Sequence, residues 1–293
     1  MKIPEGLRVG VCSHTGLVRG ANEDDYLLAT PPLVEGAAFV AAVADGMGGA
    51  AGGAEASRTA LRALGAALLD GDGDVSMRDG FARASARVLE SAAAVPALRD
   101  MGTTLTALYL DDGVGVVGHV GDSRIYRLRA DTLEAVTTDH SLKQGESLLT
   151  RCIGGGQTAW EPDTERLEVL GGDRFVLCTD GVWNVVGEAA FAAIAAAREP
   201  QRVAERLVRA ALDAGGPDNA TAVVVDVVDP RRSANLEADL PRHERPGVRA
   251  LWPAARSLRA PVWPWLLLLA ALGLLLWSGL RIAGVDPAEL LGG

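Results

Sequence analysis

The segment LYLDDGVGVVGHVGDSRIYRL, Leu108 to Leu128, decides the fold class. It holds three apolar runs of strand length, and Asp112-Gly113 between the first two is a hairpin signal. Connections this short join antiparallel neighbours, because a parallel crossover needs about a dozen residues or more. We therefore expect an antiparallel sheet in which these strands follow one another.

Similar strand-like runs, bounded by turn-forming residues, occur along most of the chain. They are LRVGVCS (7–13), AAFVAAVAD (37–45), TTLTALYLDD (103–112), LEAVTT (133–138), RFVLCTD (174–180) and TAVVVDVVD (221–229). Helical periodicity marks residues 54–70, 77–93, 188–197 and 200–215. Because paired helices lie between early and late strands, the pattern predicts an α+β fold, a four-layer α-β-β-α sandwich with two central, mainly antiparallel sheets flanked by helices.

Composition excludes several classes of protein. With 48% hydrophobic and 23% charged residues, the chain of 293 residues buries a core and is not wholly disordered. Its three cysteines, Cys12, Cys152 and Cys178, are too few and too irregularly spaced for a disulfide framework or a zinc knuckle. We expect them to be small core residues in a protein of the reducing cytoplasm.

Charge is spread unevenly along the chain. Residues 1–230 hold 20 Lys and Arg against 33 Asp and Glu, a net charge of −13, whereas residues 231–259 hold seven arginines against three acids, a net charge of +4. Proteins that bind nucleic acid need basic surface to replace counterions. The acidic part of the chain therefore argues against nucleic acid as a partner.

The run VWPWLLLLAALGLLLWSGL, residues 262–280, carries no charge over 19 residues. That length crosses a hydrocarbon core of roughly 30 Å as a helix, and tryptophans near both ends favour the membrane interface; the alternative is a buried core helix. Arginines precede the run, which places residues 1–261 in the cytoplasm by the positive-inside rule, and no signal peptide is visible at the N-terminus. The sequence thus predicts a globular domain (1–230), an Arg/Pro-rich juxtamembrane linker (231–261), a single transmembrane helix (262–280) and a short extracytoplasmic tail (281–293) at the cell membrane.

Aspartates stand at the ends of predicted strands beside a small or flexible residue. They occur in the pairs Asp45-Gly46, Asp122-Ser123, Asp180-Gly181 and Asp218-Asn219. Taken singly, each pair is typical of a turn. If the strands converge, these carboxylates and the acids of RGANEDDY (19–26) surround one cluster of hard divalent cations, and an all-oxygen ligand set suits Mg²⁺ or Mn²⁺ rather than Zn²⁺.

Eight motifs along residues 7–228 resemble, in order, those of the metal-dependent protein phosphatase family of the protein phosphatase 2C type, most closely its bacterial members. They are RGANEDD, VADGMGG, MGTT, VGDSRIYRL, TTDHS, LLTRCIGG, VLCTDGVW and DNATAVVV. The resemblance implies that residues 1–230 are a catalytic domain with a central β-sandwich. It also implies hydrolysis of phosphoserine and phosphothreonine on proteins by a hydroxide that bridges two Mn²⁺ or Mg²⁺ ions.

The resemblance also implies a role for each residue that matches a motif position. Asp45 is similar to the carboxylate that bridges both metals, and the carbonyl of Gly46 to a ligand of the second metal. Asp180 and Asp218 match ligands of the first metal.

The remaining implied roles concern the second metal, a third metal and the phosphate. Glu23 and Asp24 match the acidic pair beside the second metal, and Asp122 matches a position that, with Asp180, holds a third and weaker ion. Arg19 matches the arginine that grips the phosphate. The physics agrees, because paired metals lower the pKa of water and the planar guanidinium binds two phosphate oxygens together.

Two positions depart from the family pattern in residue type. Met47 stands where eukaryotic relatives carry a histidine proposed as general acid, which leaves that role unassigned. His14 stands where many relatives have aspartate, and it either transfers a proton, orients Arg19, or is a satisfied structural histidine. Asp25 has no matching role, and we expect a solvated or strand-edge carboxylate.

A third departure is a deletion. Between Asp139 and Leu149 the chain has only a short link where family members commonly insert a helical flap, and the following stretch GQTAWEPDTERLEV offers Trp160 as a substitute wall. We expect a more open cleft with weak preference for the residues that flank the phosphorylated side chain. A sharp preference across a phosphopeptide panel would contradict this.

The leading interpretation is a membrane-anchored cytoplasmic phosphatase that acts on phosphoproteins, opposite a Ser/Thr kinase. The alternative is a catalytically idle, membrane-tethered module that binds or scaffolds phosphoproteins. A metal-dependent nuclease or other phosphodiesterase would use the same acids, but the net charge of −13 over residues 1–230 opposes binding of a polyanion.

Overall fold

The computed structural model confirms the hairpin predicted at Asp112-Gly113. Strands β7 (Leu105–Asp111) and β8 (Val114–Val120) are antiparallel, with Asp111 opposite Val114. Asp112 and Gly113 both have positive φ, 41° and 79°, as a two-residue type I′ turn requires. The model describes residues 3–30, 38–70, 77–142, 148–156, 160–229 and 235–236, which all lie in a unit spanning Met1–His243.

The expectation that the next strand continues the same sheet is wrong. Strand β9 (Arg124–Arg129) pairs with β10 (Thr132–Ala135) and β13 (Arg174–Cys178) in a different sheet. Stacked sheets lie about 10 Å apart, and three extended residues span about that distance. The link Gly121–Ser123 therefore steps between sheets, with Gly121 at φ +112°.

Two five-stranded antiparallel sheets form the centre of the unit. The first has the order β12-β8-β7-β4-β3, and the second has the order β10-β9-β13-β14-β2. The strands not yet given bounds are β2 (Leu7–His14), β3 (Asp25–Ala29), β4 (Phe39–Ala44), β12 (Asp163–Glu168) and β14 (Ala220–Val227). Short strands add a three-stranded sheet of β11 (Ile153–Gly154), β6 (Gly102–Thr103) and β5 (Gly46–Met47), and a pair of β1 (Ile3–Pro4) with β15 (Asn235–Leu236).

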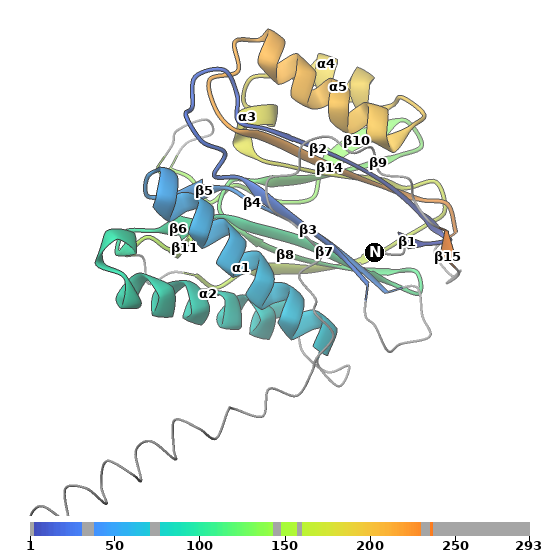
Figure 1. The fold of residues 1–293 in the computed structure, drawn as a ribbon. Coiled ribbons are helices and arrows are strands. Elements are labelled where there is room, and N and C mark those ends of the chain that lie inside the picture. Colours follow the sequence, from blue (N-terminus) through green and yellow to red (C-terminus); the bar gives the residue numbers. More distant parts are fainter. Residues whose placement is uncertain are drawn as a thin grey trace, which may run out of the picture. The chain divides into compact units, whose positions relative to one another are not determined.

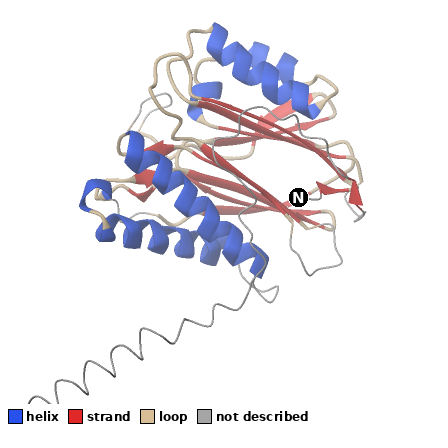
Figure 2. Cartoon of the chain, viewed as in Figure 1, coloured by secondary structure: helices blue, strands red, loops and turns tan. Residues whose placement is uncertain are grey.

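Helices cover the outer faces of both sheets (Figures 1 and 2). Helices α1 (Ala50–Asp70) and α2 (Met77–Ala94) cover the first sheet, with a 3₁₀ turn at Pro96–Leu98. Helices α3 (Asp180–Trp183), α4 (Glu188–Ala195) and α5 (Pro200–Asp213) cover the second. The α-β-β-α layering of the described residues matches the prediction.

Three clusters of buried apolar residues lie between the four layers of helices and sheets. Phe39, Leu108 and Phe175 are among the residues buried between the sheets. Separate clusters lie beneath α1 and α2 and beneath α4 and α5. Cys152 and Cys178 are buried and Cys12 is half-buried, all three as free thiols, and burial raises the pKa of each. They are structural rather than reactive residues.

Helix α1 begins four residues before the predicted start. The amides of Gly52 and Gly53 both donate to the carbonyl of Gly49, whose φ is +83°. A Cβ added at Gly53 would lie 1.8 Å from a carboxylate oxygen of Glu23. The glycines that obscured the helical pattern therefore let its first turn approach the acidic loop closely.

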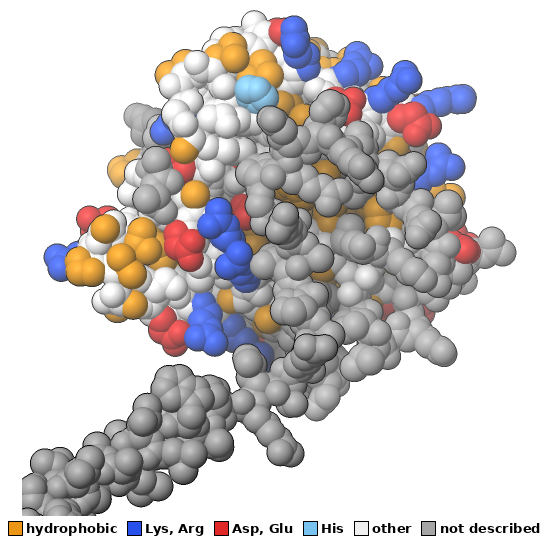
Figure 3. Space-filling view, viewed as in Figure 1, with side chains coloured by type: hydrophobic (Ala, Val, Ile, Leu, Met, Phe, Trp, Pro, Cys, Tyr) orange, Lys and Arg blue, Asp and Glu red, His pale blue; other side chains and the backbone are white. Residues whose placement is uncertain are grey.

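The predicted membrane segment and the linker after residue 236 lie outside the described residues, as does the second unit, Glu244–Gly293. Within the part of the chain that the structure describes, no helix is both long enough and apolar enough to cross a membrane. The outward face of α5 carries exposed arginines and acids side by side (Figure 3). The described surface of this helix is therefore of mixed charge.

Candidate metal and phosphate site

The predicted acidic residues come from both sheets and meet at one end of the sandwich, near α3 and β5 (Figure 1). Asp45 and Asp122 follow strands β4 and β8 of the first sheet. Asp180 begins α3 just after β13, and Asp218 precedes β14, in the second sheet. The step between sheets at Gly121 is part of what brings the two groups together.

Asp45 and Asp180 are in direct contact through a hydrogen bond between their carboxyl groups. Burial, followed by the charges of Asp24, Asp180 and Asp122, raises the pKa of Asp45 well above its ordinary value. Burial, followed by the nearby Asp180 and Asp139 carboxylates, raises the pKa of Asp122 to about 7. These buried carboxylates repel one another, and a cation would relieve the repulsion.

Asp24 is held by two hydroxyl groups, one on β14 and one on the residue that follows β13. Thr179 and Thr221 each donate a hydroxyl hydrogen to Asp24 Oδ2, at 2.8 and 2.7 Å. Ser13 Oγ lies 2.8 Å from Thr221 Oγ1 and receives a hydrogen bond from Asn22 Nδ2. Because Thr221 gives its only hydrogen to Asp24, Ser13 must be the donor to Thr221, so the whole chain of donors points toward Asp24.

Two buried oxygens are left over. Among the described residues, Asp24 Oδ1 and Asp180 Oδ1 are the buried side-chain atoms with no hydrogen-bond partner. Burial raises the pKa of Asp24 to about 7 despite its two hydroxyl donors. Unpartnered buried acceptors are costly, and carboxylate oxygens are the ligands that Mg²⁺ and Mn²⁺ prefer. The donor set therefore fits a divalent cation.

Some of the acidic side chains have partners within the site. No group of three His, Cys, Asp or Glu side chains within the described ranges has the spacing of a preformed metal site. Asp45 bonds Asp180, and Asp218 bonds Arg19.

The backbone of Glu23 is fixed from three directions. Its amide donates to Asn219 Oδ1 at 2.8 Å, and its carbonyl accepts from Ser57 Oγ at 2.7 Å and from the Gly46 amide at 3.2 Å. A Cβ added at Gly46 would lie 2.2 Å from the Gly53 carbonyl oxygen, so only glycine fits between this loop and α1. Burial raises the pKa of Glu23, while Arg19 opposes that effect.

Arg19 lies at the exposed rim of the acidic group. Its Nη2 donates to Asp218 Oδ2 at 2.7 Å, and its side chain is 53% exposed. The bond to Asp218 raises the pKa of Arg19, which therefore stays protonated. A solvent-accessible guanidinium thus stands beside a predicted metal ligand, as phosphate binding between the two would require.

His14 ends β2 opposite Ala220, and its side chain is exposed. Its Nδ1 accepts a hydrogen bond from the Gly16 amide at 2.9 Å. Among the described residues no hydrogen bond joins His14 to Arg19, and the bond that the ring does make orders the loop locally. Met47 lies half-buried in β5 and offers no proton.

Asn219 is a residue of the site that sequence reasoning passed over. Its Nδ2 donates hydrogen bonds to the carbonyls of Thr15 and Ala21 at 2.7 and 2.9 Å, while its Oδ1 accepts a hydrogen bond from the Glu23 amide. One side chain therefore pins both ends of the loop that carries Arg19. Its position next to Asp218 in the DNAT motif could have indicated a role in the site. However, an Asp-Asn pair is more typical of a turn.

The described ends of the link between Asp139 and Leu149 pair with each other. Ser141 forms a β-bridge with Leu149, and the Thr150 amide donates to the His140 carbonyl at 2.8 Å. Residues 143–147 and 157–159 lie outside the described residues. Trp160 is partly buried and packs against the core cluster beneath α1 and α2.

Comparisons with known proteins agree with this geometry. A family profile described as "Protein phosphatase 2C" matches residues 14–214. The serine/threonine protein phosphatase PstP of Mycobacterium tuberculosis (strain ATCC 25618 / H37Rv) is 37% identical over 246 residues, covering 76% of this chain and 45% of PstP. Protein phosphatase PhpP of Streptococcus pneumoniae serotype 2 (strain D39 / NCTC 7466) is 32% identical over 208 residues, covering 63% of this chain and 84% of PhpP. The chain thus spans less than half the length of PstP.

Solved structures give the same result. The catalytic domain of PstP in complex with two manganese ions superposes with a TM-score of 0.66 at 34% identity, covering 76% of this chain and 99% of that domain. PppA of Pseudomonas aeruginosa, described as a key regulatory component of T6SS, has a TM-score of 0.66 at 32% identity over 76% of this chain and 98% of its own.

Proposed function

Because the chain belongs to the protein phosphatase 2C family, we propose that it is a metal-dependent phosphatase that hydrolyses phosphoserine and phosphothreonine on proteins. The observation that carries the proposal is the buried group of carboxylates from two sheets, with two unpartnered oxygens and an exposed arginine at its rim. Neither a turn nor an ordinary core needs such an arrangement. The relatives' names support the same activity.

The residues that would hold the ions are those at the strand ends. Asp45 would contact both metals, Asp180 and Asp218 the first, and the Gly46 carbonyl the second. Glu23 and Asp24 would complete the second site directly or through water, and Asp122 would join Asp180 at a third, weaker site. Mn²⁺ or Mg²⁺ bound there supplies an activated water and neutralises charge at the phosphoryl oxygens.

The chain's own residues bind and orient the substrate. Arg19 offers a planar fork to two phosphate oxygens, and Asn219 holds the loop that presents it. Thr179 and Thr221 keep Asp24 Oδ1 free for the cation by occupying Oδ2. The proton for the departing alkoxide has no assigned donor. His14 stays a subsidiary candidate, and an unchanged acidic limb in the pH–rate profile of His14→Gln would exclude it.

The activity is tested with the full chain and two substrates, para-nitrophenyl phosphate and a phosphothreonine peptide. We expect Mn²⁺-dependent release of phosphate from both, with loss of most activity in Asp45→Asn. Arg19→Ala should raise KM for the monoester more than it lowers kcat, because the guanidinium binds the phosphate. Glu161→Gln, at an exposed position, is the matched control and should act as the wild type does.

Two outcomes would favour other functions. Folded protein that binds a phosphopeptide without Mn²⁺-dependent hydrolysis would support the idle scaffold module. Hydrolysis of bis-para-nitrophenyl phosphate in preference to the monoester would support a phosphodiesterase.

We also propose that the domain acts at the cytoplasmic face of the cell membrane on substrates of a Ser/Thr kinase. The support is the uncharged run 262–280 with its flanking arginines. Tethering would raise the effective concentration of membrane-associated substrates. Release of the full chain from membranes by alkaline carbonate would contradict a spanning anchor.

A further inference from the structure

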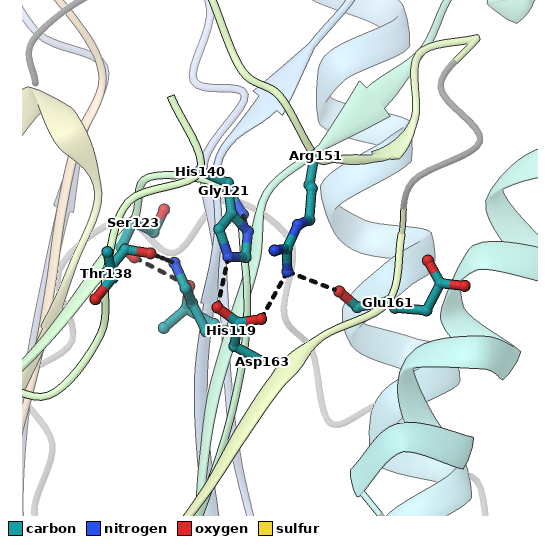
Figure 4. A network of polar contacts seen from close by, with 9 residues as sticks. His119, Gly121, Ser123, Thr138, His140, Arg151, Glu161 and Asp163 are labelled. Atoms are coloured by element: carbon teal, nitrogen blue, oxygen red, sulfur yellow. Dashed lines mark hydrogen bonds and ion pairs between the residues drawn. The ribbon is translucent and has the colours of Figure 1, made fainter. Parts of the chain in front are cut away.

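A polar network beside the acidic group ends on the peptide that precedes Asp122 (Figure 4). The Gly121 amide donates to His140 Nδ1 at 3.2 Å, and the His140 amide donates back to the Gly121 carbonyl at 2.7 Å. One buried residue therefore satisfies both backbone groups of Gly121. This matters because Gly121 lies in the step between sheets and has a φ of +112°.

The arrangement fixes the tautomer of His140. Nδ1 accepts from the Gly121 amide, so Nε2 must carry the hydrogen, and it donates to Asp163 Oδ2 at 3.0 Å. Asp163 Oδ1 in turn accepts a hydrogen bond from Arg151 Nη1 at 2.6 Å. Figure 4 shows this row of side chains running from Arg151 through Asp163 to His140. Arg151 thus orients Asp163, and Asp163 orients the imidazole.

A second route runs from Asp139 to the next peptide group, at the Asp122 carbonyl. Arg124 donates two hydrogen bonds to Asp139, at 2.8 and 2.7 Å, and its guanidinium lies 3.3 Å from the ring centroid of Trp183. Trp183 Nε1 donates to the Asp122 carbonyl at 2.9 Å. The Asp139-His140 dipeptide therefore holds Gly121 directly and Asp122 through Arg124 and Trp183.

From this geometry we propose that His140, oriented by Asp163 and Arg151, is a positioning residue that sets the direction of the Asp122 carboxylate. The inference rests on the proposed metal site but not on catalysis. Loss of the His140 clamp should weaken binding of the third ion, which depends on Asp122, and leave binding at the first and second sites unchanged. Removal of outer partners of metal ligands typically weakens metal binding about 10- to 100-fold.

A matched pair of substitutions separates this role from simple packing. Asparagine places Oδ1 near the position of His Nδ1, so His140→Asn keeps the acceptor for the Gly121 amide. Glutamine places Nε2 near the position of His Nε2, so His140→Gln keeps the donor to Asp163 and loses that acceptor. Mn²⁺ binding to the full chain is followed by the electron paramagnetic resonance signal of free Mn²⁺, with hydrogen exchange of the peptide 117–126 measured in the presence of EDTA.

We expect His140→Gln to weaken the Asp122-dependent Mn²⁺ site at least about 10-fold and to speed exchange at residues 120–123, with His140→Asn near the wild type. The Asp122→Asn variant shows which Mn²⁺ site depends on Asp122, because that site should lose affinity in it. Unchanged Mn²⁺ affinity in His140→Gln, equal losses in both variants, or wild-type Mn²⁺ binding by Asp122→Asn would each overturn the proposal. Failure of the proposed function has a separate signature, Mn²⁺ binding without phosphate release.

Discussion

At the residue scale, the orientation of Asp24 depends on hydroxyl groups rather than on other charges. Thr179 Oγ1 accepts the Thr221 amide at 3.0 Å, which leaves its hydrogen for Asp24. Both hydroxyl donors lie on the same carboxylate oxygen. Asp24 Oδ2 is therefore held by two donors, and Oδ1 has no hydrogen-bond partner.

Adjacent acids in RGANEDDY should respond differently to the same substitution. Asp24→Asn removes a buried carboxylate whose Oδ1 has no partner, so we expect Mn²⁺ affinity to fall about tenfold or more. Asp25→Asn is the matched control, because Asp25 begins the edge strand β3 and binds the Tyr26 amide. Isothermal titration with Mn²⁺ measures both. Similar losses in the two variants would contradict the assignment.

Thr221→Val should weaken the metal site without removing any charge. The valine lacks the hydroxyl that donates to Asp24, so the carboxylate loses a bond of the stronger, charge-assisted kind, about 1.5–3 kcal/mol. We expect the apparent Mn²⁺ affinity to fall about tenfold. Thr59→Val, in α1, is the control, because its hydroxyl donates to Glu55 on the helix surface. A Thr221→Val variant that binds Mn²⁺ normally would show that Asp24 needs no such support.

At the scale of elements, α5 docks on the edge strand β2 through its first turn. Gln201 pairs its side-chain amide with both backbone groups of Val11, at 3.0 and 3.1 Å, and so covers the free edge of the second sheet. A Cβ added at Gly10 would lie 2.3 Å from the Gln201 nitrogen. The helix therefore requires a glycine beneath it.

Gly10→Ala should consequently destabilise the fold. The new methyl group meets backbone atoms, which do not move aside as a flexible side chain would, so we expect a loss of about 2 kcal/mol or more in the free energy of unfolding. Gly20→Ala is the control, since a Cβ there meets nothing within 4 Å. Urea denaturation followed by circular dichroism compares the two. Equal stability would mean that α5 lies further from β2.

At the scale of the whole molecule, buried carboxyl groups lie close together where the ends of the two sheets meet. Burial, opposed by the Thr221 and Thr179 hydroxyls, raises the pKa of Asp24 to about 7, and burial with the Asp180 charge does the same for Asp122. Aspartates in the unfolded chain ionise near pH 4. The folded, metal-free chain therefore binds more protons than the unfolded chain between about pH 4 and 7.

This difference predicts how stability depends on pH and metal. The contribution is fully present below about pH 4 and is lost as the pH rises through 7, so in EDTA the Tm should be lower at pH 8 than at pH 5. Mn²⁺ should raise the Tm more at pH 8, where it replaces no protons; at 100 times its Kd it stabilises by about 2.7 kcal/mol. Differential scanning fluorimetry checks this. An Mn²⁺-induced shift that is equal at both pH values would argue against ionisation of these groups.

The sequence by itself determined the strands, the main helices and the identity of the acids. Apolar periodicity and the Asp112-Gly113 turn fix local structure, because they depend on neighbours along the chain. Asp45, Asp122, Asp180 and Asp218 could be selected as strand-end carboxylates for the same reason. Strands β3 and β12 and the first turn of α1 escaped prediction, since charged residues interrupt the apolar pattern in the strands and glycines interrupt it in the helix.

Only the tertiary structure decided which sheet each strand joins and what surrounds each acid. A three-residue link such as Gly121–Ser123 permits either a hairpin or a crossing to the stacked sheet. Here the chain crosses to the other sheet at Gly121, whose φ is positive and whose amide is bonded to His140. The partners of Asp24 lie 155 and 197 positions away along the chain, just after β13 and on β14 respectively. Sequence patterns report local preference, whereas these contacts exist only once distant strands have packed, which is why the supporting residues could not be read from the sequence.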